Sequence, residues 1–126
     1  MEKIIIRTDA APAPIGPYNQ AVGYGDLLYI SGQTCIDPVT GQLNNATLVE
    51  ETHQVMRNLQ AILQEAGLDF QQVLKSTIFL TDMHQFAIVN EVYGSYFTGD
   101  YPARETVQVS ALPKFVNVEI SMIVGK

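Results

Sequence analysis

The sequence contains a single cysteine, Cys35, and no tryptophan. One thiol cannot form a disulfide within the chain, and a zinc site built from cysteines needs more of them. A metal would have to rely on His53, His84 and carboxylates, but neither histidine has the H-x-x-x-H or H-E-x-x-H spacing typical of zinc sites. The sequence therefore predicts no metal centre. Cys35 has no activating histidine near it in the sequence, so we expect an unreactive bystander thiol.

Basic residues are also scarce. Seven lysines and arginines stand against thirteen acidic residues, which gives a formal net charge of -6, and no run of like charges concentrates either sign. Phosphate backbones repel such a chain on average, so the composition argues against nucleic acid as a partner.

Long hydrophobic runs are absent. No segment approaches the ~20 apolar residues that cross a bilayer, and Met1-Glu2-Lys3 leads directly into Ile4-Ile5-Ile6 without the pattern of a secretory signal. We therefore expect a cytoplasmic protein with no membrane partner. The chain has 126 residues, no internal repeat and no long linker, so we expect a single domain over residues 1–126.

The sequence alternates short strand-like segments with longer helix-like ones. β-Branched and alternating apolar residues predict strands near residues 3–7, 20–24, 27–31, 73–81, 104–111 and 116–124. Gly25-Asp26 suits a tight hairpin turn between the second and third strands. Asp37-Pro38-Val39-Thr40-Gly41 marks another turn.

Two helices are predicted between these strands. Thr47 begins a capping box, and apolar residues then recur at helical spacing as far as Gly67. Asp82 repeats the cap signal before a second helix that ends near Gly99. The aromatic residues of this second helix are expected in the core, and they are Tyr93, Tyr96 and Phe97.

The resulting order of elements is β-β-β-α-β-α-β-β. Each helix joins two strands, and right-handed crossovers would place both helices on one face of the sheet. We therefore predict an α+β fold in which a mixed sheet has one covered and one open face.

The last two strands carry the polar residues that could support chemistry. Arg104, Thr106 and Gln108 alternate along one strand face, and Glu119 points away from the apolar face of the final strand. If these strands pair as an antiparallel hairpin, Arg104 and Glu119 share one sheet face. Two interpretations remain open: a cross-strand ion pair on a solvated surface, or an arginine that grips a substrate carboxylate beside a glutamate that holds water.

Several ordered motifs resemble those of the RidA (reactive intermediate deaminase A, YjgF-like) family. The resemblance extends from about residue 3 to residue 124. The motifs are Ile15-Gly16-Pro17-Tyr18-Asn19-Gln20-Ala21, Ile30-Ser31-Gly32-Gln33, Val89-Asn90, Pro102-Ala103-Arg104, Leu112-Pro113-Lys114 and Val118-Glu119-Ile120.

This resemblance implies a chorismate-mutase-like α+β fold and a homotrimer with ligand clefts between subunits. It also implies hydrolysis of 2-iminobutanoate, 2-iminopropanoate or their enamine tautomers to 2-keto acids and ammonia, without cofactor or metal. The ligand would be a small 2-imino or 2-keto acid.

The resemblance also assigns roles to residues. Arg104 would bind the substrate carboxylate, and Glu119 would position and activate water. Three residues would line the cleft, namely Tyr18, Ser31 and Asn90. Thr106 stands where many family members have cysteine, so thiol chemistry is excluded there, while its backbone could still contact the imine or water.

Other functions compete with this one. The same arginine could serve a binding module that senses a small carboxylate or 2-keto acid without turnover. A hydrolase could instead act on an aminoacrylate-type enamine. RNA cleavage, claimed for some relatives, is disfavoured by the acidic composition.

Overall fold

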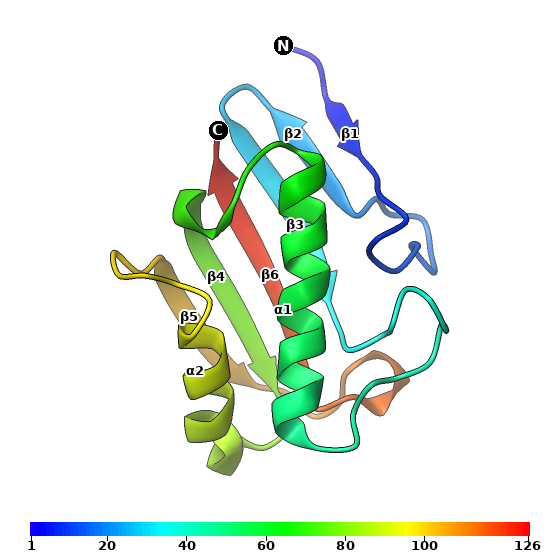
Figure 1. Cartoon of the computed structure of the whole chain (residues 1–126), viewed down its shortest axis with the longest axis vertical. Coiled ribbons are helices and arrows are strands. Elements are labelled where there is room, and N and C mark those ends of the chain that lie inside the picture. The colour runs from blue at the N-terminus through cyan, green and yellow to red at the C-terminus, as the bar shows by residue number, and fades with distance from the viewer.

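The computed structural model describes residues 1–126 and contains six β-strands and two α-helices (Figure 1). Their order confirms the predicted alternation. In chain order the elements are β1 (Ile4–Ile6), β2 (Ala21–Tyr24), β3 (Leu27–Gln33), α1 (Leu48–Glu65), β4 (Val73–Leu80), α2 (Phe86–Gly94), β5 (Ala103–Gln108) and β6 (Val118–Gly125).

All six strands form one mixed sheet in the order β1-β2-β3-β6-β4-β5. β6 lies between β3 and β4 and is antiparallel to both, whereas β5 pairs only with β4, in parallel. The predicted hairpin of the last two strands is therefore wrong. β5 and α2 instead complete a crossover unit with β4, in which a helix joins two adjacent parallel strands.

Both helices cover the same face of this sheet, as predicted (Figure 1). The Thr47 side chain accepts a hydrogen bond from the Glu50 backbone and so begins α1, and Gly67, with φ +74°, follows its end. Apolar residues of α1 pack against alternate residues of the central strands. They belong to one hydrophobic core of 23 buried residues.

The local turns agree with the sequence. The β2–β3 hairpin turns through Gly25 and Asp26, with Gly25 at φ +60°, a conformation that glycine adopts without steric cost. Asp37 closes its predicted turn by accepting a hydrogen bond from the Gly41 backbone. Asp82 caps a 3₁₀ turn at Met83–Gln85 that precedes α2, so its cap acts one short element earlier than expected.

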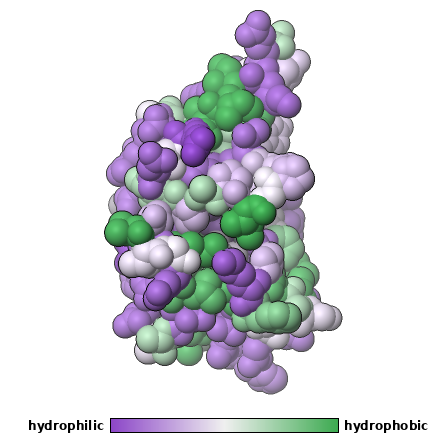
Figure 2. Space-filling model, turned by 90° about the vertical axis from the view of Figure 1, so that its right-hand side faces the viewer, coloured by the Kyte–Doolittle hydropathy of each residue, from purple (hydrophilic) through white to green (hydrophobic).

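Apolar side chains also reach the surface. Figure 2 shows hydrophobic areas scattered among hydrophilic ones on the side that carries β1, with one such area at the upper end. Ile4 and Ile5 of β1 are 51% and 46% exposed. No helix is both long enough and apolar enough to span a membrane.

Candidate functional site

Arg104 lies on β5, on the sheet face that the helices cover. Its Nη1 atom donates a hydrogen bond of 2.7 Å to Oδ1 of Asn90 on α2. Its guanidinium carbon lies 5.2 Å from the ring centre of Tyr93 and 5.5 Å from that of Phe86. Two aromatic rings and an amide therefore contact this cation at distances typical of cation–π pairs.

A hollow of about 700 Å³ opens beside Arg104. It lies between the second half of α2 and the segment that leads into β5. Its lining residues are Asn90, Glu91, Tyr93, Gly94, Ser95, Tyr101, Pro102 and Arg104. We call it the arginine hollow. The guanidinium has five donors and Asn90 uses one of them, so donors remain for a planar anion.

Glu119 lies on β6 and lines a second, smaller pocket of about 360 Å³. We call it the glutamate pocket, and its lining residues are Ile15, Tyr18, Ser31, Gly32, Thr34, Ile36, Pro113, Lys114 and Glu119. Burial raises the pKa of the Glu119 carboxyl above its ordinary value of 4.5. No cation pairs with Glu119 to offset this burial.

The Glu119 carboxyl occupies space that the absence of a side chain at Gly32 leaves open. A Cβ atom at Gly32 would meet Oε2 of Glu119 at 2.7 Å and the carboxyl carbon at 2.8 Å. The carboxyl group therefore rests directly on the bare backbone of β3. Only glycine leaves this space free.

Two further predicted residues shape the same pocket. The Ser31 hydroxyl donates a 2.6 Å hydrogen bond to the carbonyl oxygen of Asn19, and the Tyr18 hydroxyl accepts one of 3.3 Å from the Ile15 backbone. The Ser31 hydrogen bond ties the loop before β2 to the sheet, and the Tyr18 hydrogen bond lies within that loop. Tyr18 remains 46% exposed at the pocket mouth.

The structure separates Arg104 from Glu119. Arg104 pairs with Ser76 of β4, which is buried beneath the helices, whereas Glu119 pairs with Phe79, whose other neighbour is Val107. Arg104 and Glu119 therefore lie on opposite faces of the sheet, and the two hollows share no residue. The predicted common face is wrong, because β5 and β6 do not pair with each other: each takes its register from β4, where Ser76 and Phe79 are three positions apart and so point to opposite faces.

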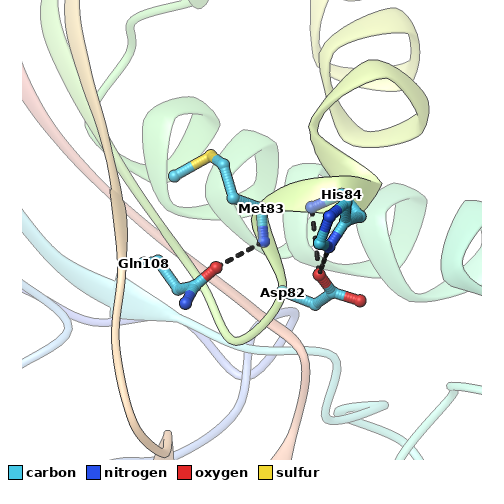
Figure 3. A network of polar contacts seen from close by, with 4 residues as sticks. All are labelled: Asp82, Met83, His84 and Gln108. Atoms are coloured by element: carbon cyan, nitrogen blue, oxygen red, sulfur yellow. Dashed lines mark hydrogen bonds and ion pairs between the residues drawn. The ribbon is translucent and has the colours of Figure 1, made fainter.

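Thr106 and Gln108 lie on the same face of β5 as Arg104 and also face the helices. The Thr106 hydroxyl is buried and has no hydrogen-bond partner. The Gln108 side chain accepts a 2.7 Å hydrogen bond from the Met83 backbone, beside the cap that Asp82 makes with His84 (Figure 3). Gln108 is therefore occupied in holding the turn before α2, and it lines neither hollow.

Cys35 and the histidines belong to neither hollow. Burial is the main reason that the pKa of the Cys35 thiol rises to about 11, so the thiolate is scarce at neutral pH. His53 Nδ1 lies 2.7 Å from the Tyr96 hydroxyl, and His84 contacts Asp82. No three metal-binding side chains come together.

Sequence reasoning missed several contributors. Tyr93 was expected only in the core, yet its buried ring also lies under Arg104. It follows Asn90 by three positions, and this spacing places both on one helix face. Gly32 stood inside a recognised motif, but its contact with Glu119 depends on strand pairing that local sequence does not specify.

Comparison with known proteins decides the family. The family model described as Endoribonuclease L-PSP matches residues 8–125. The chain belongs to this family, which is the RidA (YjgF-like) family. The resemblance inferred from the motifs is thereby confirmed.

Relatives and solved structures of this RidA-family chain agree over almost its whole length. A mouse (Mus musculus) protein named 2-iminobutanoate/2-iminopropanoate deaminase is 50% identical over 119 residues, covering 94% of this chain and 88% of its own. A RutC family protein of Sinorhizobium fredii is 48% identical, covering 95% of each chain. The structure of E. coli TdcF with bound serine is 40% identical, with a TM-score of 0.93 and coverage of 98% of both chains.

Proposed function

We propose that this RidA-family protein hydrolyses small reactive 2-imino acids, or their enamine tautomers, to 2-keto acids and ammonia. The observation that carries the proposal is a pair of complementary hollows. One presents a fixed guanidinium, and the other a half-buried carboxyl group with a raised pKa. The first suits the carboxylate of the substrate, and the second suits proton transfer to and from water.

Arg104 is the anion-binding group in this proposal. A guanidinium can bind a carboxylate through two parallel hydrogen bonds, which are stronger than neutral ones. Its position is already restricted by Asn90 and by the rings of Tyr93 and Phe86, so less side-chain entropy is lost when the ligand binds. A 2-imino acid held in this way would present its C=N carbon at a defined place.

Glu119 is the acid–base group. A protonated imine is electrophilic, so water adds to its carbon while the Glu119 carboxylate accepts one proton from that water. The protonated Glu119 carboxyl then returns this proton to the amino group of the carbinolamine, which becomes the ammonium leaving group. The C–N bond breaks as the Glu119 carboxylate accepts the hydroxyl proton, which leaves the 2-keto acid and ammonia, and the ammonia takes that proton from Glu119 to leave as ammonium. A carboxyl pKa raised by burial makes the carboxylate a better proton acceptor near neutral pH.

A complete site requires more than one copy of the chain, because the two groups lie on opposite sheet faces. We propose a homotrimer in which the arginine hollow of one copy meets the glutamate pocket of the next. The open sheet face would then lie between subunits. Tyr18 and Ser31 would join Glu119 on one side of the cleft, and Asn90 and Thr106 would join Arg104 on the other.

Similar proteins support this class of ligand. The mouse relative is named for the deamination of 2-iminobutanoate and 2-iminopropanoate, and the TdcF structure contains serine, a small molecule with a carboxylate. Both ligands fit an arginine that binds a short anionic molecule.

Complementation between variants tests the proposal. Arg104→Ala and Glu119→Gln should each slow the accelerated loss of 2-iminobutanoate generated by a dehydratase by roughly 100-fold or more. When the two variants are unfolded, mixed and refolded, about one quarter of the interfaces should pair an intact arginine with an intact glutamate. Recovered activity supports the shared site. An inactive mixture of correctly assembled trimers contradicts it.

Other functions predict different experimental results. A binding module would show thermal stabilisation by 2-ketobutanoate without faster imine loss. An aminoacrylate-type hydrolase would prefer that enamine over 2-iminobutanoate. RNA cleavage, the activity in the description of the family model, would appear as shortened RNA after incubation with the protein, and the RNA binding that it requires is disfavoured by a net charge of -6.

A further inference from the structure

The first helix buries a row of polar side chains toward the sheet. Glu51, Gln54 and Asn58 are spaced by three and four residues, so they share one face of α1, and they are 0%, 6% and 1% exposed. Burial of a polar group is unfavourable unless it is hydrogen bonded, and burial of a carboxylate is especially so. The hydrogen-bond partners of these three side chains therefore determine whether their burial is tolerated.

Glu51 binds the start of β6. Its Oε2 atom accepts hydrogen bonds from the backbone nitrogens of Asn117 at 2.7 Å and Val118 at 3.0 Å, and its Oε1 atom accepts one from the Asn117 side chain at 2.8 Å. No cation pairs with this carboxylate. Its contacts thus end one residue before Glu119.

Asn58 binds the segment that follows β3. Its side-chain nitrogen donates to the carbonyl oxygens of Thr34 at 3.0 Å and Ile36 at 2.9 Å. Gln54 donates to the Asn58 side-chain oxygen at 2.9 Å and so fixes the orientation of that amide. Thr34 and Ile36 both line the glutamate pocket.

Glu51 and Asn58 therefore bind main-chain segments on different walls of the glutamate pocket. Figure 1 shows the N-terminal half of α1 beside both the segment after β3 and the segment before β6. The rest of the buried face of α1 is apolar, with Val55, Leu59 and Ile62 fully buried, except for Thr52, whose hydroxyl donates to the Leu48 carbonyl oxygen within the helix. Polar groups occur where main-chain atoms next to the pocket need partners.

We propose that Glu51 and Asn58 are positioning residues that hold Glu119 and the facing Thr34–Ile36 wall in place for catalysis. Neither residue lines the pocket, so each acts through the backbone that it binds. The inference rests on the proposed function for its kinetic test. A displacement of about 1 Å in a reacting group can lower a rate by about 100-fold.

A double-variant cycle separates positioning from general stability. Glu51→Ala should lower kcat by about 10- to 100-fold with a small change in KM. In a Glu119→Gln background the same substitution should have almost no further effect, because the group that it positions is gone. Equal losses in both backgrounds would overturn the inference.

Two controls accompany this cycle. Glu51→Gln keeps one oxygen that can accept both backbone hydrogen bonds, as Oε2 does now, and should retain most activity. Ile62→Val removes one buried methyl group from the same helix and should lower stability without changing kcat. If Glu51→Ala does not fold, Asn58→Ala in both backgrounds replaces it, with the same coupling to Glu119 expected.

A readout without substrate keeps the inference distinct from the proposed function. Carbon-13 NMR titration should show the Glu119 carboxyl pKa above 4.5 in the wild type and closer to 4.5 in Glu51→Ala, because a displaced carboxyl becomes hydrated. A wild-type protein without deaminase activity would refute the proposed function alone. An unchanged Glu119 titration in the folded Glu51 and Asn58 variants would refute the positioning role.

Discussion

The arginine hollow and the glutamate pocket hold their key groups by opposite means. Arg104 is surrounded by favourable contacts, with an amide acceptor and two aromatic rings. Glu119 rests on bare backbone at Gly32 and has no paired cation, and burial raises its pKa. A group that binds an anion benefits from being satisfied and rigid, whereas a group that moves protons benefits from a destabilised charge.

The largest predicted effect falls on the glutamate pocket. Glu119→Gln should lower kcat by about 10² to 10⁴, the usual contribution of a general acid–base residue. Wild-type kcat/KM should fall as the pH is lowered through the raised carboxyl pKa, and the variant should lose this acidic limb. Steady-state kinetics across pH measures both. A variant with full kcat would show that Glu119 only lines the pocket.

Removal of Arg104 from the arginine hollow should weaken substrate binding. Arg104→Ala should lower kcat/KM by roughly 100-fold, because two charge-assisted hydrogen bonds to the carboxylate are lost. Arg104→Lys should not restore it, since an ammonium cannot reproduce the planar contact. Arg7→Ala, which removes an exposed arginine on another segment, is the matched control. Equal activity of Arg104→Lys and wild type would show that the two parallel hydrogen bonds of the guanidinium are not needed.

The comparison also predicts a difference in stability. Burial raises the pKa of Glu119, so the folded protein binds this proton more tightly than the unfolded chain does. Its contribution to stability is therefore most favourable below pH 4.5 and declines as pH rises through the folded pKa. Glu119→Gln should raise Tm at neutral pH, and this gain should disappear in acid. A gain of equal size at all pH values would point to packing instead.

The smallest expected effect concerns Thr106, beside the arginine on β5. Its buried hydroxyl has no partner, so Thr106→Val should stabilise the free protein by about 1 kcal/mol. Denaturant unfolding measures this change. Weaker thermal stabilisation of the variant by 2-ketobutanoate would show that the ligand supplies the missing partner, and unchanged stabilisation would assign the hydroxyl no role in binding.

Local sequence patterns predicted the elements, but they did not predict the pairing of strands. Helical spacing from Thr47 to Gly67 and the turn at Gly25 depend on neighbouring residues, and both agree with the structure. The hairpin of the last two strands was inferred from their closeness in sequence. The helix between β4 and β5 makes them parallel neighbours, and this crossover turns Arg104 toward α2.

The candidate site likewise combines residues that local sequence predicts with an arrangement that it does not. Motifs identified Tyr18, Ser31, Asn90, Arg104 and Glu119, and each lies at one of the two hollows. Their grouping into two sets could not be read from alternation along single strands, because it depends on the register in which β5 and β6 each pair with β4. The buried contacts of Glu51 and Asn58 were likewise invisible, since their partners lie far away in the sequence.

The contact between Gly32 and Glu119 gives the chemistry a vulnerability that neither ionisable residue reveals. One extra methyl group on β3 would occupy the volume that the carboxyl now fills. A chain could therefore keep its arginine and its glutamate and still lose activity if alanine replaced Gly32, because the carboxyl group would have to move. Sorting active from inactive homologues requires inspecting this small residue as carefully as the charged ones.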